Sequence, residues 1–254
     1  MFLTHRLRGN ELLDEGTIVV CDALRESKVS RIEELDLSYN RIGLPGAESV
    51  AAYVAVTASL TSVNLLSNKM DIESATMLLK VKAEKSMLRT LCGLTHEETE
   101  INLNSQGLGP ADAMLLAPEV SVMTSLTKIL VSWNELGDEG TTILCDAIRE
   151  STVSKVEELD LERNEIGPNG AKAIAALCAD KASLTSVWTP AHKPMPLPFL
   201  MHAAAMPSWI VPSTDHQLCT YHCLQLNLSD NLLGPKGAEA LAPALVKTSL
   251  TKIE

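Results

Sequence analysis

One short phrase recurs along this chain at a regular spacing, and this repetition limits the possible folds more than any other feature. The clear copies run from Leu35 to Ala47, from Leu159 to Ala171 and from Leu226 to Ala238. All seven copies centre on an amide residue, namely Asn10, Asn40, Asn68, Gln106, Asn134, Asn164 and Asn231. The basic step is 28–30 residues, with two enlarged steps. Such a period predicts stacked units that bury one continuous core.

Each unit contains the signals of one strand, one turn and one helix. Leu35 and Leu37 alternate with polar residues, which predicts a short strand with both leucines on one face. Asn40 and its equivalents are predicted to bond the backbone of the turn. Helices are expected to begin near Asp14, Pro45, Asp71, Pro110, Asp138, Pro168 and Pro235, where proline suits the first turn and aspartate caps its own helix. Strands are expected around residues 7, 35–37, 63–65, 101–103, 129–131, 159–161 and 226–228.

A longer repeat overlies the basic one. The sequence from Asn10 to Val63 matches that from Asn134 to Val187 at a constant offset, with 34 of 54 positions identical. This identity indicates an internal duplication of a block of repeats.

The signature is interrupted in two places. The segment from Leu88 to Thr99 enlarges one step and is interpreted as a longer loop. Residues 188–222 are rich in Pro and His and have no repeat pattern; they are interpreted as a loop insertion, a gene-model artefact or a binding element. We therefore divide the chain into repeats at 1–187, this irregular segment, and a repeat with a truncated next unit at 223–254. The unfinished last unit leads us to expect a longer parent protein.

Composition excludes several classes of protein. Apolar residues make up 46% of the chain and the net charge is −11, which argues against both disorder and general nucleic-acid binding. Six dispersed cysteines are too few for a disulfide scaffold. The first residues form no secretory signal and no segment is predicted to span a membrane. We expect a cytoplasmic protein.

The pattern L-x-x-L-x-L-x-x-N-x-L/I-G-x-x-G-A resembles that of leucine-rich repeats. The helical second half and the period of 28–30 residues are similar to the ribonuclease-inhibitor-like class. The resemblance covers roughly residues 2–187 and 223–254. It implies an α/β solenoid curved like a horseshoe, with a parallel sheet on the concave face and helices on the convex face.

No motif in the sequence predicts catalysis. Phosphate-binding loops, nucleophile elbows and zinc-protease helices are all missing. His216, Cys219, His222 and Cys223 are suitable ligand types, but their spacing is cramped for zinc. We predict no enzyme activity, no metal and no cofactor.

Strand geometry predicts the surface that contacts a partner. If Leu35 and Leu37 face the core, their neighbours face the opposite side of the sheet. Aromatic and arginine side chains just before the turn asparagines add typical interface anchors. The partner-binding candidates are Glu34, Asp36, Ser38, Tyr39, Lys128, Leu130, Trp133, Glu158, Asp160, Glu162 and Arg163, and the structural turn residues are Asn10, Asn40, Asn68, Asn134, Asn164 and Asn231.

The resemblance implies a non-enzymatic protein–protein interaction module, and the acidic strands favour a basic protein partner. Three alternatives stay open: a regulator similar to the Ran GTPase-activating proteins, a ribonuclease inhibitor, and the sensor part of a larger protein. The sequence leaves the oligomeric state undefined.

Overall fold

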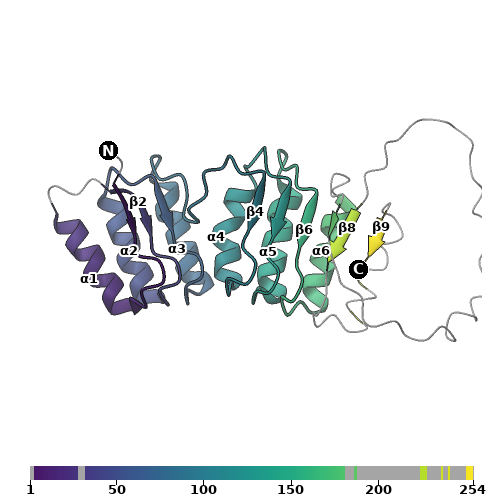
Figure 1. Ribbon diagram of the computed structural model, residues 1–254, viewed down its shortest axis with the longest axis horizontal. Coiled ribbons are helices and arrows are strands. Elements are labelled where there is room, and N and C mark those ends of the chain that lie inside the picture. The colour runs from purple at the N-terminus through teal and green to yellow at the C-terminus, as the bar shows by residue number, and fades with distance from the viewer. Residues whose placement is uncertain are drawn as a thin grey trace, which may run out of the picture.

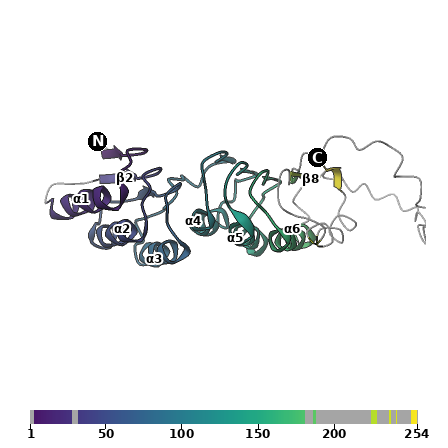
Figure 2. The ribbon, with the colours of Figure 1, turned by 90° about the horizontal axis from the view of Figure 1, so that it is seen from below.

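The computed structural model describes residues 3–27 and 32–180, and beyond them residues 186–187, 224–227, 236, 240 and 250–253. The units lie in a row along the long axis of the molecule (Figure 1). Helices form one layer and strands the other (Figure 2). Asn231, Pro235 and the irregular segment 188–222 lie outside the described residues.

Helix and strand alternate in the order that the repeats predict. The strands are β1 Leu3–Arg6, β2 Ile32–Asp36, β3 Ser62–Asn64, β4 Glu100–Asn102, β5 Lys128–Leu130, β6 Glu158–Asp160, β7 Ser186–Val187, β8 Leu224–Asn227 and β9 Leu250–Ile253. The helices are α1 Leu13–Glu26, α2 Leu44–Val56, α3 Ile72–Ala83, α4 Pro110–Val120, α5 Gly137–Glu150 and α6 Pro168–Asp180. The predicted helix starts within these residues are correct to within one position. The strand predicted around Leu7 ends one residue earlier, at Arg6.

All the strand pairs are parallel, but they form two sheets. One sheet has the order β1-β2-β3; the other has the order β4-β5-β6-β8-β9, with β7 also paired to β6. Between them, the segment predicted to be a plain loop makes two isolated bridges to β3, from Thr90 to Ser62 and from Cys92 to Asn64. We call residues 3–83 the first block, 84–99 the joint and 100–180 the second block. A single apolar core runs through all three.

The turn asparagines link neighbouring units. The Asn40 amide donates to the carbonyl oxygens of Leu7, at 2.8 Å, and of Leu37, at 3.1 Å. Its Oδ1 atom accepts from the backbone N–H groups of Asn10 and Leu12 in the preceding unit. Equivalent bonds surround Asn68, Asn134 and Asn164. The predicted turn role is therefore present, and it also joins units 28–30 residues apart.

Asp14 and Asp138, predicted to cap their own helices, instead cap the next unit. Asp14 Oδ1 accepts from the backbone N–H groups of Gly43, at 2.7 Å, and Gly46, at 3.0 Å, at the start of α2. Asp138 does the same for Gly167 and Gly170 at α6. A Cβ atom on Gly46 would lie 2.7 Å from Asp14 Oδ1, so glycine is needed for this close approach. The prediction was wrong for these two aspartates because their caps are made between units. Asp71 does cap its own helix α3, accepting from Ser74 N at 2.8 Å.

Two buried carboxylates of α4 hold the joint together. Glu119, whose side chain is 0% exposed, accepts from Leu91 N and the Thr90 hydroxyl at 2.7 Å each. Lys82 Nζ lies 3.1 Å and His96 Nε2 lies 3.3 Å from its oxygens. Since an unpaired buried charge is strongly destabilising, these partners make Glu119 a cross-link between α3, the joint and α4.

The second carboxylate belongs to Asp112, which is 2% exposed. Its two oxygens accept from Ser67 N in the first block and from Gly109 N at the start of α4. Burial raises the pKa of this carboxyl to about 6. The joint therefore replaces one missing step of the asparagine ladder with side chains from a helix.

Candidate partner-binding face

The strand face is the surface of the two sheets turned away from the helices. Strand register arranges its side chains in rows across neighbouring strands, which are about 4.8 Å apart. In the first block one row runs Arg6, Asp36, Asn64. The corresponding row in the second block runs Asn102, Leu130, Asp160. The predicted candidates on β5 and β6 therefore lie side by side, whereas those on β2 lie in the other sheet.

One predicted candidate is not on this surface. Ser38 is only 1% exposed, and its hydroxyl and backbone N–H donate to Asp36 Oδ1 at 2.7 and 3.0 Å. Leu66 and Ser132, at the equivalent positions in two other units, are also buried. The strand has ended at this position and the turn has begun, so strict alternation of exposed and buried residues no longer holds. Ser38 is corrected to a buried turn residue.

The second block has an acidic strand face. Lys128 Nζ pairs with Glu158 Oε1 at 3.1 Å, and Arg163 Nε lies 3.9 Å from Glu162 Oε1. Asp160 accepts from Glu162 N at 3.1 Å and from the Ser132 hydroxyl. Among the residues whose side chains are described, Asp160 has no ion-pair partner. Its neighbour across the row is the apolar Leu130.

The environment of Asp160 disfavours its negative charge. Burial raises the pKa of the Asp160 carboxyl above its ordinary value, and the carboxylates of Glu162 and Glu158 raise it further. A cation placed beside Asp160 would relieve both effects. The arrangement therefore suits a lysine or arginine side chain supplied from outside.

The first block has a strand face of mixed charge. The carboxylates of Glu34 and Asp36 match those of Glu158 and Asp160 in the duplicated sequence. Here, however, Arg6 lies in register beside Asp36, and Arg8 lines the same hollow. Two cations and two carboxylates line one hollow on β1, β2 and β3. The sequence interpretation missed both arginines because they precede the duplicated stretch, which begins at Asn10.

An aromatic ring and an arginine stack beside each acidic strand. The Arg8 guanidinium lies 4.4 Å from the centre of the Tyr39 ring, and that of Arg163 lies 4.0 Å from the Trp133 ring. Trp133 is 51% exposed, Arg163 is exposed and Tyr39 is half-buried. The two stacks join equivalent pairs of units. Arg163 stands at the position of Tyr39, whereas Trp133 stands at the position of Gly9, one residue after that of Arg8.

These anchors occupy strained backbone positions. Tyr39, Trp133 and Arg163 have φ values of 58°, 59° and 51°, in the left-handed region that favours glycine. Gly9 occupies the equivalent position in the first unit, with φ 68°. A bulky residue there costs about 1–2 kcal/mol. Ser67 and Ser105, at the same position of other units, have φ values of 62° and 57°, so this conformation belongs to the turn of the repeat.

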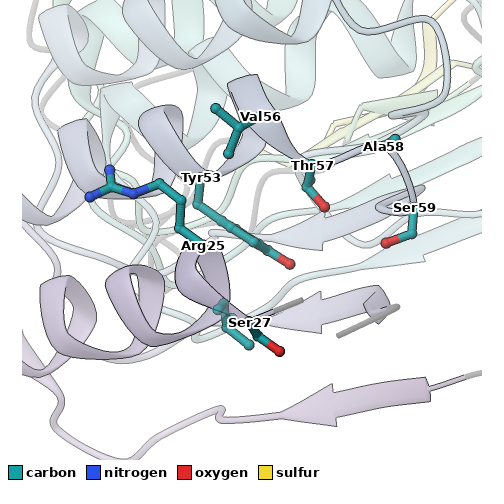
Figure 3. Close-up of a pocket in the computed structure, with 8 residues that line it drawn as sticks. Arg25, Ser27, Tyr53, Val56, Thr57, Ala58 and Ser59 are labelled. Carbon is teal, nitrogen blue, oxygen red and sulfur yellow. The ribbon is translucent and has the colours of Figure 1, made fainter. Parts of the chain in front are cut away.

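A second hollow lies on another edge of the molecule, which is formed by the C-terminal ends of helices. A hollow of about 420 Å³ lies between the C-terminal ends of α1 and α2 and is lined by Tyr53, Arg25 and Thr57 among others (Figure 3). Arg25 is already paired with Asp22 at 2.8 Å. None of the sequence-predicted site residues line this hollow, and the described residues around it form no nucleophile–base pair.

The buried thiols add no further site among the described residues. Burial raises the pKa of Cys21 and of Cys178 to about 11, so both stay protonated and pack as small apolar groups. Within the described residues no group of His, Cys, Asp or Glu side chains is arranged to hold a metal ion. The sequence motif of His216 to Cys223 lies outside these residues. No described helix is long and apolar enough to span a membrane.

Comparison with known proteins identifies the repeats. The family model described as "Leucine Rich repeat" matches residues 32–51, 122–142, 154–175 and 222–242. The first three stretches each include a strand, a turn or a helix start described above. The match therefore covers both blocks.

The chain is also similar to several curated proteins. It is 26% identical to the ribonuclease inhibitor of Sus scrofa over 96% of this chain and 55% of that protein. It is 26% identical to "NACHT, LRR and PYD domains-containing protein 5" of Homo sapiens, over 94% of this chain and 20% of the relative. It is 23% identical to "Protein CARMIL" of Dictyostelium discoideum, over 85% and 20%.

The chain thus spans about half the length of the ribonuclease inhibitor and about a fifth of the other two relatives. Repeats of this kind imply a curved solenoid. From its repeats, its parallel strands and its relatives, the chain belongs to the leucine-rich-repeat proteins and is of the ribonuclease-inhibitor-like class.

Proposed function

We propose that this chain is a non-enzymatic module that binds a basic protein partner through the strand face of its second block. The observation that carries the proposal is Asp160, a carboxylate beside the apolar Leu130 with no ion-pair partner among the described side chains. Glu158 and Glu162 flank it, and each of them has a cation beside it, Lys128 and Arg163 respectively. A lysine or arginine from the partner would supply the missing charge.

Trp133 and Arg163 provide the contact that charge alone does not. Charge complementarity mainly raises the rate of association, whereas a desolvated aromatic side chain slows dissociation. Trp133 lies next to the acidic strand, is exposed, and is held by Arg163. The proposal assigns Trp133 as the anchor and Asp160 as the steering charge.

The test uses an octalysine peptide as a basic probe and measures binding kinetics by surface plasmon resonance. Asp160→Lys should slow association by about tenfold, because it reverses a local charge. Trp133→Gly should speed dissociation, and since Gly9 tolerates this backbone position, the variant should remain as stable as the parent. Val122→Ser, a change at an exposed position on the opposite edge, is the control. Unchanged kinetics in both face variants would contradict the proposal.

A second candidate function is inhibition of a ribonuclease. The likeness to the ribonuclease inhibitor of Sus scrofa over nearly the whole of this chain favours it. An assay of ribonuclease activity with the chain in molar excess tests it directly. Inhibition that Asp160→Lys abolishes would identify the basic partner as the enzyme itself.

A further inference from the structure

The strand face of the first block contains a hollow of about 340 Å³. It lies on the sheet formed by β1, β2 and β3, apart from the acidic face at β6. Its charged and polar lining consists of Arg6, Arg8, Glu34, Asp36, Ser62 and Asn64. A hollow of this size is typical of a site for a small ligand or a short length of chain.

Side chains of both charges line this hollow. Arg6 and Asp36 lie in register on neighbouring strands, yet neither makes an ion pair among the described residues. The Arg8 guanidinium is stacked on Tyr39, which fixes its position at the rim. A ligand of one sign would leave the opposite charge facing it, so the hollow complements a ligand that carries both.

The spacing favours an extended polypeptide. Glu34 and Asp36 lie two residues apart on β2, so their side chains are separated by about 6.7 Å. An extended peptide has the same separation between alternate side chains. Ser62 and Asn64 on β3 add polar groups that can bond a peptide backbone.

A glycine, Gly93, lines one edge of the hollow. Gly93 has φ 69°, and a Cβ atom there would lie 3.0 Å from Asn64 Cβ. A larger residue would crowd the asparagine at the edge of the hollow.

Comparison of the duplicated blocks separates this hollow from the acidic face. Glu34 and Asp36 have identical equivalents in Glu158 and Asp160. At the same offset, Arg6 corresponds to Leu130 and Arg8 to Ser132. The two faces therefore share their carboxylates and differ in the cations beside them.

We propose that the hollow on β1, β2 and β3 is a second binding site, selective for a polypeptide segment in which acidic and basic side chains alternate. The inference rests on the proposed function in one respect only, that the strand face is the binding surface. The two blocks would then hold chemically different segments of a partner, one of mixed charge and one basic.

The experiment exchanges residues between the blocks in the full chain. The probes are an alternating (Glu-Lys)4 peptide and octalysine, and binding is mapped by amide chemical shifts and measured by fluorescence anisotropy. Arg6→Leu gives the first block the residue of the second, and Leu130→Arg does the reverse. Arg6→Leu should weaken binding of (Glu-Lys)4 by about fivefold, since one exposed ion pair is removed, and should leave octalysine binding at β6 unchanged. Leu130→Arg should weaken octalysine binding and leave the alternating peptide on the first block unchanged.

The outcomes separate this inference from the proposed function. If (Glu-Lys)4 changes the amide chemical shifts of β1 to β3 and Arg6→Leu weakens its binding, the second site stands, even where octalysine fails to bind at β6. If both peptides bind at β6, or if Arg6→Leu leaves the affinity for (Glu-Lys)4 unchanged, the second site is refuted while the proposed function stands. If neither peptide binds, both are refuted.

Discussion

The first and second blocks are two copies of one scaffold with different strand faces. Asp14 and Asp138 each cap the next helix through an equivalent pair of glycine amides. Beside the shared carboxylates, however, Arg6 is replaced by Leu130 and Tyr39 by Arg163. The comparison indicates that contacts between units determine the fold, whereas a few outward side chains determine what each block can bind.

The largest expected effect concerns the joint that connects the two blocks. Glu119→Ala should lower the free energy of unfolding by about 3–5 kcal/mol, because it leaves Lys82 and the buried amide of Leu91 without their partner. Urea denaturation followed by circular dichroism measures this. Glu97→Ala, at an exposed position in the joint, is the control and should change stability by less than about 0.5 kcal/mol. A similar small loss for Glu119→Ala would mean that the blocks are joined by other contacts.

The next prediction compares the cores of the two blocks. Leu37 and Leu161 are equivalent and both 0% exposed. Leu37→Ala and Leu161→Ala should each cost about 2–5 kcal/mol, the usual range for a buried leucine. Their costs should agree within about 1 kcal/mol, since the surroundings are duplicated. A loss below about 0.5 kcal/mol at either position would show that this leucine is not in the core.

A smaller effect is expected at the caps between units. Asp14→Ala and Asp138→Ala should each cost about 1–2 kcal/mol, as for other helix caps. Amide hydrogen exchange locates the loss: in Asp14→Ala the amides of Gly43 and Gly46 should exchange faster. Faster exchange confined to the first turn of α1 would instead show that Asp14 caps its own helix.

The last stability prediction concerns pH and the carboxyl of Asp112. Its pKa is raised from 3.8 to about 6 in the folded chain, so the folded state binds the proton more tightly than the unfolded state. Its contribution to the free energy of unfolding should therefore fall as pH rises from 3.8 to about 6 and then level off. The difference between the wild-type chain and Asp112→Asn, measured by urea denaturation at each pH, isolates this contribution. A difference that grew with pH would contradict the assigned direction.

Much of the fold could be predicted because its signals are local and repeated. Pro110 and Pro168 mark the first helical residues, and the paired leucines mark the strands. The role of Asp14 could not be predicted, because its partners lie 29 and 32 residues away in the next unit. The joint was missed for the same reason: Glu119 is 29 and 28 residues away from Thr90 and Leu91 in the sequence and contacts them only in the folded chain.

The candidate face was predicted in part. Alternation placed Glu34, Asp36, Glu158 and Asp160 correctly on the outward side of the sheet, but it failed at Ser38, where the turn folds the chain back. Charge balance could not be predicted, since it depends on which strand lies beside which. The sequence alone treated β2 and β6 as equivalent acidic strands, and register distinguishes them by Arg6 and Leu130.

The most direct test of the central claim is a matched pair of neutral substitutions at Asp36 and Asp160. Octalysine affinity is measured by fluorescence anisotropy for the wild-type chain, Asp36→Asn and Asp160→Asn at low and at physiological salt. Our account predicts that Asp160→Asn weakens binding about fivefold at low salt, as expected for one exposed charge pair, and that Asp36→Asn has little effect because Arg6 lies beside it. Equal losses in the two variants, or a loss only in Asp36→Asn, would contradict the assignment of the second block as the site for a basic partner.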